Sequence, residues 1–356
     1  MPLLQKITIT QFKNYDVASF SFTERVTGIC GLNGKGKTNL LDAIYYLCFT
    51  KSYFTNNDAL NIQFAKDGFR LEGKFDEHRV VCIHRGAGKK EFYLDDVAYT
   101  KFSGHIGKFP AVMVAPDDVE LITGTSEERR RYLDTILSQV DNTYLQHLII
   151  YNKVLQQRNS LLKRFAETGN TDWVLLETVD EQLVQPGNYI WQKRKELTEK
   201  LIPLVKQLYN QIAGTDEDVF LQYQSQLNGM DFYALLEQCR QKDFILQRSN
   251  GGVHKDDIEI LMNGQVFKST ASQGQRKSLL FALKLAEFEI LKQNKGFAPL
   301  LLLDDVFEKL DDNRMSHLLN MVCLQNSGQV FITDTHYDRL HESLSAMGVS
   351  FQLIEL

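Results

Sequence analysis

Residues 26–47 read VTGICGLNGKGKTNLLDAIYYL, and this stretch decides the fold. The apolar run from Val26 to Cys30 predicts a buried strand, and the apolar residues that follow Thr38 keep a helical spacing. Between them, residues 31–38 fit the pattern GxxxxGK[ST]. Glycines in such a loop let backbone N–H groups converge, and the N-terminus of the next helix adds partial positive charge. The sequence therefore predicts a strand, a phosphate-binding loop and a helix.

The residues of this loop have expected roles in binding ATP. Lys37 would reach the β- and γ-phosphates, and the Thr38 hydroxyl would hold Mg²⁺, a hard cation that prefers oxygen ligands. The alternative is a glycine-rich turn with a surface lysine, and the flanking strand and helix argue against it. The complete loop consists of Gly31, Leu32, Asn33, Gly34, Lys35, Gly36, Lys37 and Thr38.

A second motif puts two carboxylates at the end of an apolar run. Residues 300–303 are all leucine and predict a strand that is buried on both faces, followed by Asp304 and Asp305. Ligands bind at the carboxyl ends of strands in open α/β sheets. Asp304 suits a Mg²⁺ ligand, and Asp305 would orient or deprotonate the water that attacks ATP. The alternative is a core strand that ends in a solvated Asp-Asp turn.

A third motif lies at a predicted helix start. The helix is expected from about residue 273 to residue 291, and Ser272 can act as its N-cap, which is a structural role only. The N–H groups at this helix end can also hold an anion. Because the chain already has one complete phosphate loop, a second one would serve the nucleotide of a partner subunit. The segment consists of Ser272, Gln273, Gly274 and Gln275.

The remaining patterns predict two parts of one sheet domain with a helical insertion. Apolar residues from 127 to 165 keep the spacing of one long amphipathic helix, and a second helical stretch from 173 to 208 is expected to kink or break at Pro186-Gly187. The fold class is α/β: an ATPase head, residues 1–125 and 251–356, with an inserted, mostly helical arm, residues 126–250. Strands are expected near residues 4–12, 18–22, 26–30, 69–99, 111–115, 258–262, 300–303 and 329–333.

Composition limits the partners and the compartment. The net charge of −5 provides no global field for a polyanion, so contacts with nucleic acid need local basic patches. The five cysteines lie far apart without a CxxC pair, which fits reduced core residues better than disulfides. No apolar run has the length of a signal peptide or a membrane span. We therefore expect a soluble, cytoplasmic protein.

Two basic clusters are candidates for contacts with DNA phosphates. Either cluster can meet phosphates, but neither can read bases by itself. For the arginine run, the alternative is a solvated helix face that pairs with nearby glutamates. The candidates are Arg129, Arg130 and Arg131 in the first cluster, and Arg85, Lys89 and Lys90 in the second.

The combination of motifs resembles the ABC and SMC ATPases, and most closely the RecF family. Residues 272–275 look like the ABC signature, and residues 308–311 look like the loop that follows the Walker B motif. The separation between Lys37 and Gly274 is long for a transporter ATPase and short for an SMC protein with its large coiled coil. Further matches to the RecF family lie at residues 11–15, 116–118, 128–134 and 254–257, so that the resemblance spans nearly the whole chain.

The resemblance implies an ABC/SMC-type head that dimerises with ATP, each signature segment closing on the nucleotide of the other subunit. It also implies binding of double-stranded DNA near single-strand gaps, slow ATP hydrolysis that acts as a switch, and cooperation with RecO and RecR in loading RecA. Two alternatives are the ATPase subunit of a membrane transporter and a nucleotide-regulated scaffold without DNA binding. A transporter subunit would have a shorter separation between the motifs.

Some residues depart from the pattern of the family. Lys13 and Lys255 stand where arginine is expected, and Arg276 follows the signature where glutamine is usual. An ABC switch histidine would fall near Asp334, two positions before His336, so we expect His336 to be an ordinary surface histidine rather than the switch. His254 can act on the γ-phosphate or serve as a hydrogen-bonded structural histidine. Pro116-Asp117 can be a γ-phosphate sensor or a strand stop with a helix cap.

Overall fold

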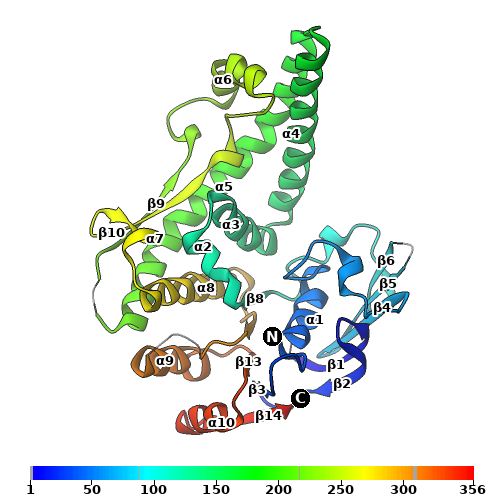
Figure 1. Cartoon of the computed structure of the whole chain (residues 1–356), viewed down its shortest axis with the longest axis vertical. Helices are drawn as coiled ribbons and strands as arrows, with labels where there is room; N and C mark the ends of the chain where they lie inside the picture. Colours follow the sequence, from blue (N-terminus) through cyan, green and yellow to red (C-terminus); the bar gives the residue numbers. More distant parts are fainter. Residues whose placement is uncertain (1–2, 87, 216, 308–310) are drawn as a thin grey trace. The chain divides into compact units, whose positions relative to one another are not determined.

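The computed structural model describes residues 3–86, 88–215, 217–307 and 311–356. The chain forms two compact units (Figure 1). The first comprises Met1–Val119, Gln207–Asp216 and Ser272–Leu356, and the second comprises Glu120–Lys206 and Glu217–Ala271. The outer divisions lie after Val119 and before Ser272, whereas the sequence suggests divisions after residues 125 and 250, and the short segment Gln207–Asp216 also belongs to the first unit.

A five-stranded parallel sheet forms one layer of the first unit, in the order β14-β3-β13-β12-β8. All strands except β14 are buried at every position, as is usual for parallel sheets covered on both faces. Only β13 separates β3 from β12, although β3 and β12 come from opposite ends of the chain. The strands are β3 (Val26–Cys30), β8 (Ala111–Val114), β12 (Leu300–Leu303), β13 (Val330–Asp334) and β14 (Phe351–Glu355).

A six-stranded antiparallel sheet forms a second layer, in the order β2-β1-β4-β5-β6-β7. Its strands confirm the paired strands predicted near the N-terminus and the antiparallel sheet predicted over residues 69–99. Burial alternates along β4, so one face of the sheet contributes to the core. The strands are β1 (Leu4–Phe12), β2 (Tyr15–Ser21), β4 (Gly68–Phe75), β5 (His78–Arg85), β6 (Lys89–Leu94) and β7 (Val97–Ala98).

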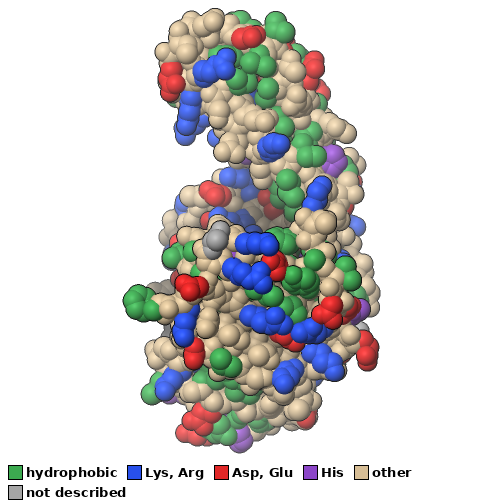
Figure 2. Space-filling model, turned by 90° about the vertical axis from the view of Figure 1, so that its right-hand side faces the viewer, with side chains coloured by type: hydrophobic (Ala, Val, Ile, Leu, Met, Phe, Trp, Pro, Cys, Tyr) green, Lys and Arg blue, Asp and Glu red, His purple; other side chains and the backbone are tan. Residues whose placement is uncertain are grey.

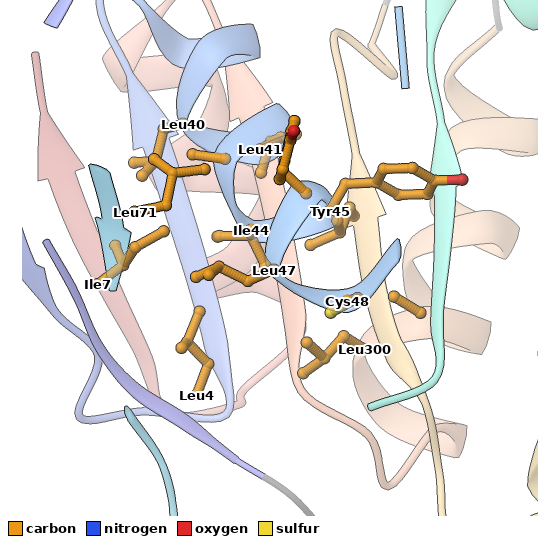
Figure 3. Packing of buried hydrophobic residues seen from close by; sticks show 14 of the residues in the cluster. Leu4, Ile7, Leu40, Leu41, Ile44, Tyr45, Leu47, Cys48, Leu71 and Leu300 are labelled. Carbon is orange, nitrogen blue, oxygen red and sulfur yellow. The ribbon is translucent and has the colours of Figure 1, made fainter. Parts of the chain in front are cut away.

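Helix α1 (Lys37–Phe49) packs against strands of both sheets, and nearly all its residues are buried. Each buried leucine or isoleucine contributes about 1.5–3 kcal/mol, so this core fixes the position of α1 and of the loop before it. Figure 3 shows α1 side chains among leucines and an isoleucine from β1, β4 and β12. The labelled residues are Leu4, Ile7, Leu40, Leu41, Ile44, Tyr45, Leu47, Cys48, Leu71 and Leu300.

The remaining elements of the first unit include the helix predicted after Ser272, which is α8 (Gln273–Lys295) and packs on β8. Helix α10 (Tyr337–Ala346) packs on β3 and β14. The other elements are η1 (Asp58–Asn61), η2 (Phe102–Gly104), η3 (Pro116–Val119), α9 (Asp312–Leu319) and the π-helical η6 (Asn320–Gln325).

The second unit is mostly helical and also contains a three-stranded antiparallel sheet, in the order β11-β10-β9. None of the helices among the described residues is long and apolar enough to cross a membrane. The elements are α2 (Glu120–Thr123), α3 (Ser126–Val140), α4 (Asn142–Thr168), α5 (Trp173–Ala213, whose end from Gln207 belongs to the first unit), β9 (Val219–Gln224), η4 (Gln226–Asn228), α6 (Phe232–Leu246), η5 (Val253–Lys255), β10 (Asp257–Met262), β11 (Gln265–Val266) and α7 (Phe267–Thr270).

The helices of this unit differ from the predictions at two places. The expected single helix over residues 127–165 is two helices, because Asp141 leaves the helical conformation and its carboxylate accepts the Tyr144 N–H of α4 at 3.1 Å. Of the kink or break expected at Pro186-Gly187, the break does not occur, because α5 continues through these residues. Gly187 instead allows close packing, since a Cβ there would lie 2.1 Å from the ring of Phe232. The free energy of this packing thus offsets the cost of the backbone hydrogen bond that is lost because Pro186 has no N–H group.

Helices α4 and α5 form an antiparallel hairpin that is tied by buried ion pairs. Arg158 of α4 is fully buried, and its guanidinium contacts Asp180 of α5 and Asp243 of α6, both at 2.5 Å. Arg194 of α5 similarly binds Asp134 at 2.9 Å and Asp256 at 3.0 Å. Removal of one partner from such a pair leaves an uncompensated buried charge and typically costs about 3–5 kcal/mol. These pairs fix the arrangement of the helices within the second unit.

Candidate functional site

The strand, loop and helix predicted for residues 26–47 are confirmed. Strand β3 ends at Cys30, α1 begins at Lys37, and Gly36 is its N-cap residue. Gly34 and Gly36 have φ values of 83° and 107°, a region that glycine adopts without strain. A Cβ on Gly36 would lie 2.7 Å from the Asn14 side-chain nitrogen, so the close approach of the β1–β2 turn also requires glycine here.

The side chain of Lys37 is held inside the loop. Its ammonium donates to the carbonyl oxygens of Gly31 at 2.7 Å and Leu32 at 3.3 Å, and the residue is only 4% exposed. A buried ammonium group needs such partners to offset its desolvation. The loop therefore holds a positive charge at the N-terminus of α1, an arrangement that suits a phosphate group.

Asp304 lies at the end of β12 and links the two halves of the site. Its carboxylate accepts hydrogen bonds from the hydroxyls of Thr38 at 2.8 Å and Thr333 at 2.7 Å. The topology explains this contact, because β13, which carries Thr333, lies between β3 and β12. Burial raises the pKa of Asp304, although both hydroxyl donors act against this shift. The atoms here that could bind a metal ion are all oxygen atoms, the ligands that Mg²⁺ prefers. A divalent cation would also favour the ionised form of the Asp304 carboxylate. The residues therefore fit Mg²⁺.

Asp305 follows in a left-handed backbone conformation, with a φ of 46°. Aspartate tolerates this region better than most residues do. The Asp305 N–H donates to the Thr333 hydroxyl at 2.9 Å, and the same hydroxyl donates to Asp304. Thr333 therefore holds both carboxylate residues of the Asp-Asp pair in position.

The segment 272–275 forms a complete capping box. The Gln275 N–H donates to the Ser272 hydroxyl at 3.2 Å, and the Ser272 N–H donates to the Gln275 side chain at 2.8 Å. The expected capping role of Ser272 is confirmed. Ser272 and Gln273 are exposed, so capping does not close this helix end to an anion. The signature role of Ser272, Gln273, Gly274 and Gln275 stays a prediction, and residues 308–310 of the loop after Asp304 lie outside the described residues.

The Pro116-Asp117-Asp118 segment forms η3, directly after β8. Asp118 accepts the Ala115 N–H at 2.9 Å and contacts the hydroxyl of Tyr53 and the ammonium of Lys284, the latter at 3.4 Å. Lys284 is buried, as is Glu287 nearby, whose pKa burial raises to about 7. Asp118 thus belongs to a buried polar cluster that connects η3 to α8, while Asp117 is exposed.

Two of the residues singled out in the sequence, His254 and Lys13, have side-chain partners within the chain. His254 interacts through its two ring nitrogens with the Tyr151 hydroxyl at 2.7 Å and the Ser249 carbonyl at 3.1 Å, and burial lowers its pKa to about 4. Asp334, where a switch histidine would fall, pairs with Arg339 at 2.5 Å, and His336 is exposed. Lys13 pairs with the buried Asp42 of α1 at 2.6 Å.

All six basic candidates have partners within the chain, but they differ in exposure. Arg129 makes two bonds to Asp257, at 2.5 and 3.0 Å; Arg130 donates to a backbone carbonyl at 2.7 Å, and Lys90 pairs with Asp58 at 2.7 Å. On the face seen in Figure 2, lysine and arginine side chains lie among acidic ones, so this face is no continuous basic surface. The more exposed candidates are Arg131, Arg85 and Lys89, each within 3.2 Å of a glutamate.

Sequence reasoning missed three residues that shape the site. Thr333 could have been found as a polar residue at the carboxyl end of a predicted core strand. Asn14 and Tyr15 were noted only as part of a family resemblance, although their side chains contact the phosphate loop. These contacts depend on how β1 and β2 pack beside the loop, which no local pattern specifies.

Comparisons with known proteins identify the family. The model of the AAA domain family matches residues 6–313. The DNA replication and repair protein RecF of Cytophaga hutchinsonii is 41% identical over 94% of this chain and 90% of its own length. A solved structure of the recombination mediator protein RecF, described as RecF-ATPrS in the RecFOR pathway, is 30% identical, covers 100% of this chain and 96% of its own and gives a TM-score of 0.88.

A more distant likeness supports the fold class. The SMC head bound to the C-winged helix domain of ScpA is 13% identical, with 99% of this chain and 94% of its own covered and a TM-score of 0.58. The fold is therefore an ABC/SMC-type ATPase head with an inserted, mostly helical arm, as the sequence predicted. With the full-length match to RecF relatives, this architecture shows that the chain belongs to the RecF family of DNA replication and repair proteins.

Proposed function

We propose that this protein binds and hydrolyses ATP to control its action on DNA in recombinational and replication-gap repair. The observation that carries the proposal is the contact between Thr38 and Asp304, which joins the end of the phosphate loop to the carboxylates after β12. The comparisons add that a similar protein of known structure is described as RecF-ATPrS. ATP binding at this site is the simplest use of a loop that already holds a lysine and a threonine in this arrangement.

The residues of the site have distinct roles in this proposal. Backbone N–H groups of residues 31–38 and the ammonium of Lys37 bind the phosphates, because they combine donors with positive charge. Thr38 and Asp304 hold Mg²⁺, which neutralises phosphate charge. Asp305 orients or deprotonates the attacking water. The Thr333 hydroxyl holds the backbone of Asp305 in place. Hydrolysis is expected to be slow and to act as a switch.

A second copy of the chain completes the site in this proposal. The exposed N-terminus of α8, with Ser272, Gln273, Gly274 and Gln275, would close on the γ-phosphate bound by the partner subunit. ATP would then hold the dimer together, and hydrolysis would release it. We further propose that the first compact unit is the ATPase head and that the second is the arm.

The proposed DNA partner is double-stranded DNA near single-strand gaps. The protein is proposed to act in the cytoplasm, with RecO and RecR as its protein partners in loading RecA. The support is membership of the RecF family and the similarity to a RecF protein that is described as acting in the RecFOR pathway. Because Arg131, Arg85 and Lys89 are exposed whereas Arg129, Arg130 and Lys90 are partly buried, the phosphate contacts are assigned first to Arg131, Arg85 and Lys89.

Changing Asp305 to asparagine is expected to preserve Mg·ATP binding and to reduce hydrolysis by at least about a hundredfold, since general-base catalysis contributes roughly 10²–10⁴-fold. Asp304→Asn should also weaken the Mg²⁺ dependence of binding, because it removes an anionic oxygen ligand. Equilibrium titration of ATP at several Mg²⁺ concentrations, together with single-turnover hydrolysis, separates the two roles. If Asp305→Asn hydrolyses ATP as fast as the parent, the water is handled by another group.

DNA binding is expected to require ATP and to weaken steeply with salt, because phosphate contacts release counterions. Filter binding with gapped duplex, with and without ATP, measures the first effect. For the second, replacing Arg131, Arg85 and Lys89 with glutamine should flatten the plot of log affinity against log salt by about one unit for each real contact. If the slope is unchanged, these residues do not contact DNA. If ATP does not change the affinity for DNA and DNA does not change ATP binding or hydrolysis, the scaffold alternative is favoured.

A further inference from the structure

The turn between β1 and β2 lies directly against the phosphate loop. The Asn14 side-chain nitrogen donates to the carbonyl oxygen of Lys35 at 3.2 Å, and the Tyr15 hydroxyl donates to the carbonyl oxygen of Gly36 at 3.0 Å. Tyr15 is buried, and burial raises its pKa to about 12, so the hydroxyl remains a donor at neutral pH. Two consecutive carbonyl groups of the loop therefore accept side-chain hydrogen bonds from this turn, and the Gly36 carbonyl also accepts the Leu40 N–H of α1 at 2.8 Å.

Holding a carbonyl group also orients an N–H group, because the peptide unit is planar and trans. The Lys35 carbonyl shares its peptide plane with the Gly36 N–H, and the Gly36 carbonyl shares its plane with the Lys37 N–H. In each plane the two groups point in opposite directions. The donors of Asn14 and Tyr15 thus turn these two N–H groups away from the β1–β2 turn, at the helix end where an anion would bind.

Other contacts fix the two side chains in this position. Asn39 of α1 donates to the Asn14 side-chain oxygen at 2.7 Å, which leaves the Asn14 NH₂ group to face Lys35. Gly36 has no side chain, and a Cβ there would come within 2.9 Å of the Tyr15 hydroxyl. A rotation of either peptide plane would break one of these bonds, and Gly36, which lies between the two planes, has no Cβ to restrict such a rotation.

We propose that Asn14 and Tyr15 are positioning residues that set the affinity for the nucleotide, by holding the Gly36 and Lys37 N–H groups in the orientation that binds phosphate. This inference rests on the proposed function of the loop. It gives Asn14 and Tyr15, which stand outside the loop, a defined role, because the antiparallel sheet then preorganises a binding loop that follows a strand of the parallel sheet. Preorganisation raises affinity because less ordering is left to occur upon binding.

The test compares Tyr15→Phe, which removes a single hydroxyl group, with Asn14→Ala and Asn39→Ala. The matched control is Tyr93→Phe, which removes a tyrosine hydroxyl that donates to Glu91 on β6 of the same sheet. A neutral hydrogen bond contributes about 1 kcal/mol, so Tyr15→Phe and Asn14→Ala should each raise the KM for ATP about three- to tenfold. The kcat at saturating ATP should change less than twofold, and Asn39→Ala should have a smaller effect in the same direction.

The outcomes distinguish positioning from a merely structural role. A lower thermal midpoint without ATP, together with an unchanged KM in both Tyr15→Phe and Asn14→Ala, would overturn the proposal. So would an equal rise in KM for Tyr93→Phe. If Lys37→Ala also retains its affinity for ATP, the proposed function fails; if only the Lys37 variant loses affinity, the loop binds ATP and the positioning role alone is wrong.

Discussion

Replacing Lys37 with alanine is expected to weaken ATP binding by about a hundredfold or more. The ammonium is the one buried charge in the phosphate loop among the described residues, 2.7 Å from the Gly31 carbonyl. Hydrogen bonds to charged groups contribute roughly 1.5–3 kcal/mol each, and a triphosphate can accept more than one from this group. Since 1.4 kcal/mol corresponds to tenfold, a loss of about 3 kcal/mol gives the expected change. Equilibrium titration with a fluorescent ATP analogue measures it.

The control for this variant is Lys74→Ala, which removes an exposed lysine from β4. Lys74→Ala tests whether the loss of one positive charge anywhere on the chain lowers the affinity for a polyanion. A thermal melt without nucleotide is also needed, because Lys37→Ala removes two hydrogen bonds to the loop. Unchanged affinity in the Lys37 variant would refute the assignment of the loop as the ATP site.

The local parts of the site could be predicted from sequence because each motif carries its own geometry. A strand that runs into glycines and then a helix can only present the loop at the end of a sheet, and the structure has β3, Gly34, Gly36 and α1 in that arrangement. The leucine run 300–303 is likewise read directly as a core strand. These elements are specified by residues that are neighbours in the chain.

The features that were missed depend on residues that are far apart in the chain. Thr333 reaches Asp304 only because β13 lies between β3 and β12, and a strand order is not visible in any one strand. The end of α3 and the start of α4 at Asp141 could not be predicted, because the apolar periodicity continues from one helix into the next. The break depends on a single capping carboxylate, that of Asp141. At Gly187, the contact with Phe232 decides that a helix continues where local propensity predicts a break.

The basic candidates illustrate the same limit for function. The run of Arg129, Arg130 and Arg131 looks uniform in sequence, but the structure separates its members, since Arg129 is bound by Asp257 and Arg131 is exposed. Asp257 is far from Arg129 along the chain, so the charge pattern of residues 127–131 alone could not reveal the pair. Any assignment of DNA contacts therefore has to begin from the exposure of each basic side chain, which cannot be read from the sequence.

Ser272→Arg is expected to abolish ATP-dependent dimerisation while leaving ATP binding by the monomer intact. The capping box means that this change has a structural cost of its own: about 1 kcal/mol for the lost cap, and up to about 1 kcal/mol for a cation at a helix N-terminus. As part of a signature, the arginine would also fill the space in which the γ-phosphate of the partner subunit has to bind. The phosphate loop of the same chain, residues 31–38, is unchanged in the variant.

Thr125→Arg is the matched control, because Thr125 is the exposed N-cap of α3 and accepts the Glu127 N–H at 3.3 Å. If Ser272 only caps α8, both variants lose a similar amount of stability and both still dimerise. Sedimentation with ATP and Mg²⁺ on the hydrolysis-poor Asp305→Asn background decides the matter. The expected result is a dimer for Asp305→Asn alone and with Thr125→Arg, and a monomer with Ser272→Arg. Two results would exclude a nucleotide shared between two subunits: a Ser272 variant that dimerises as well as its parent, or a parent that stays monomeric at micromolar concentration. In either case the exposed N-terminus of α8 would not bind the γ-phosphate of a partner subunit.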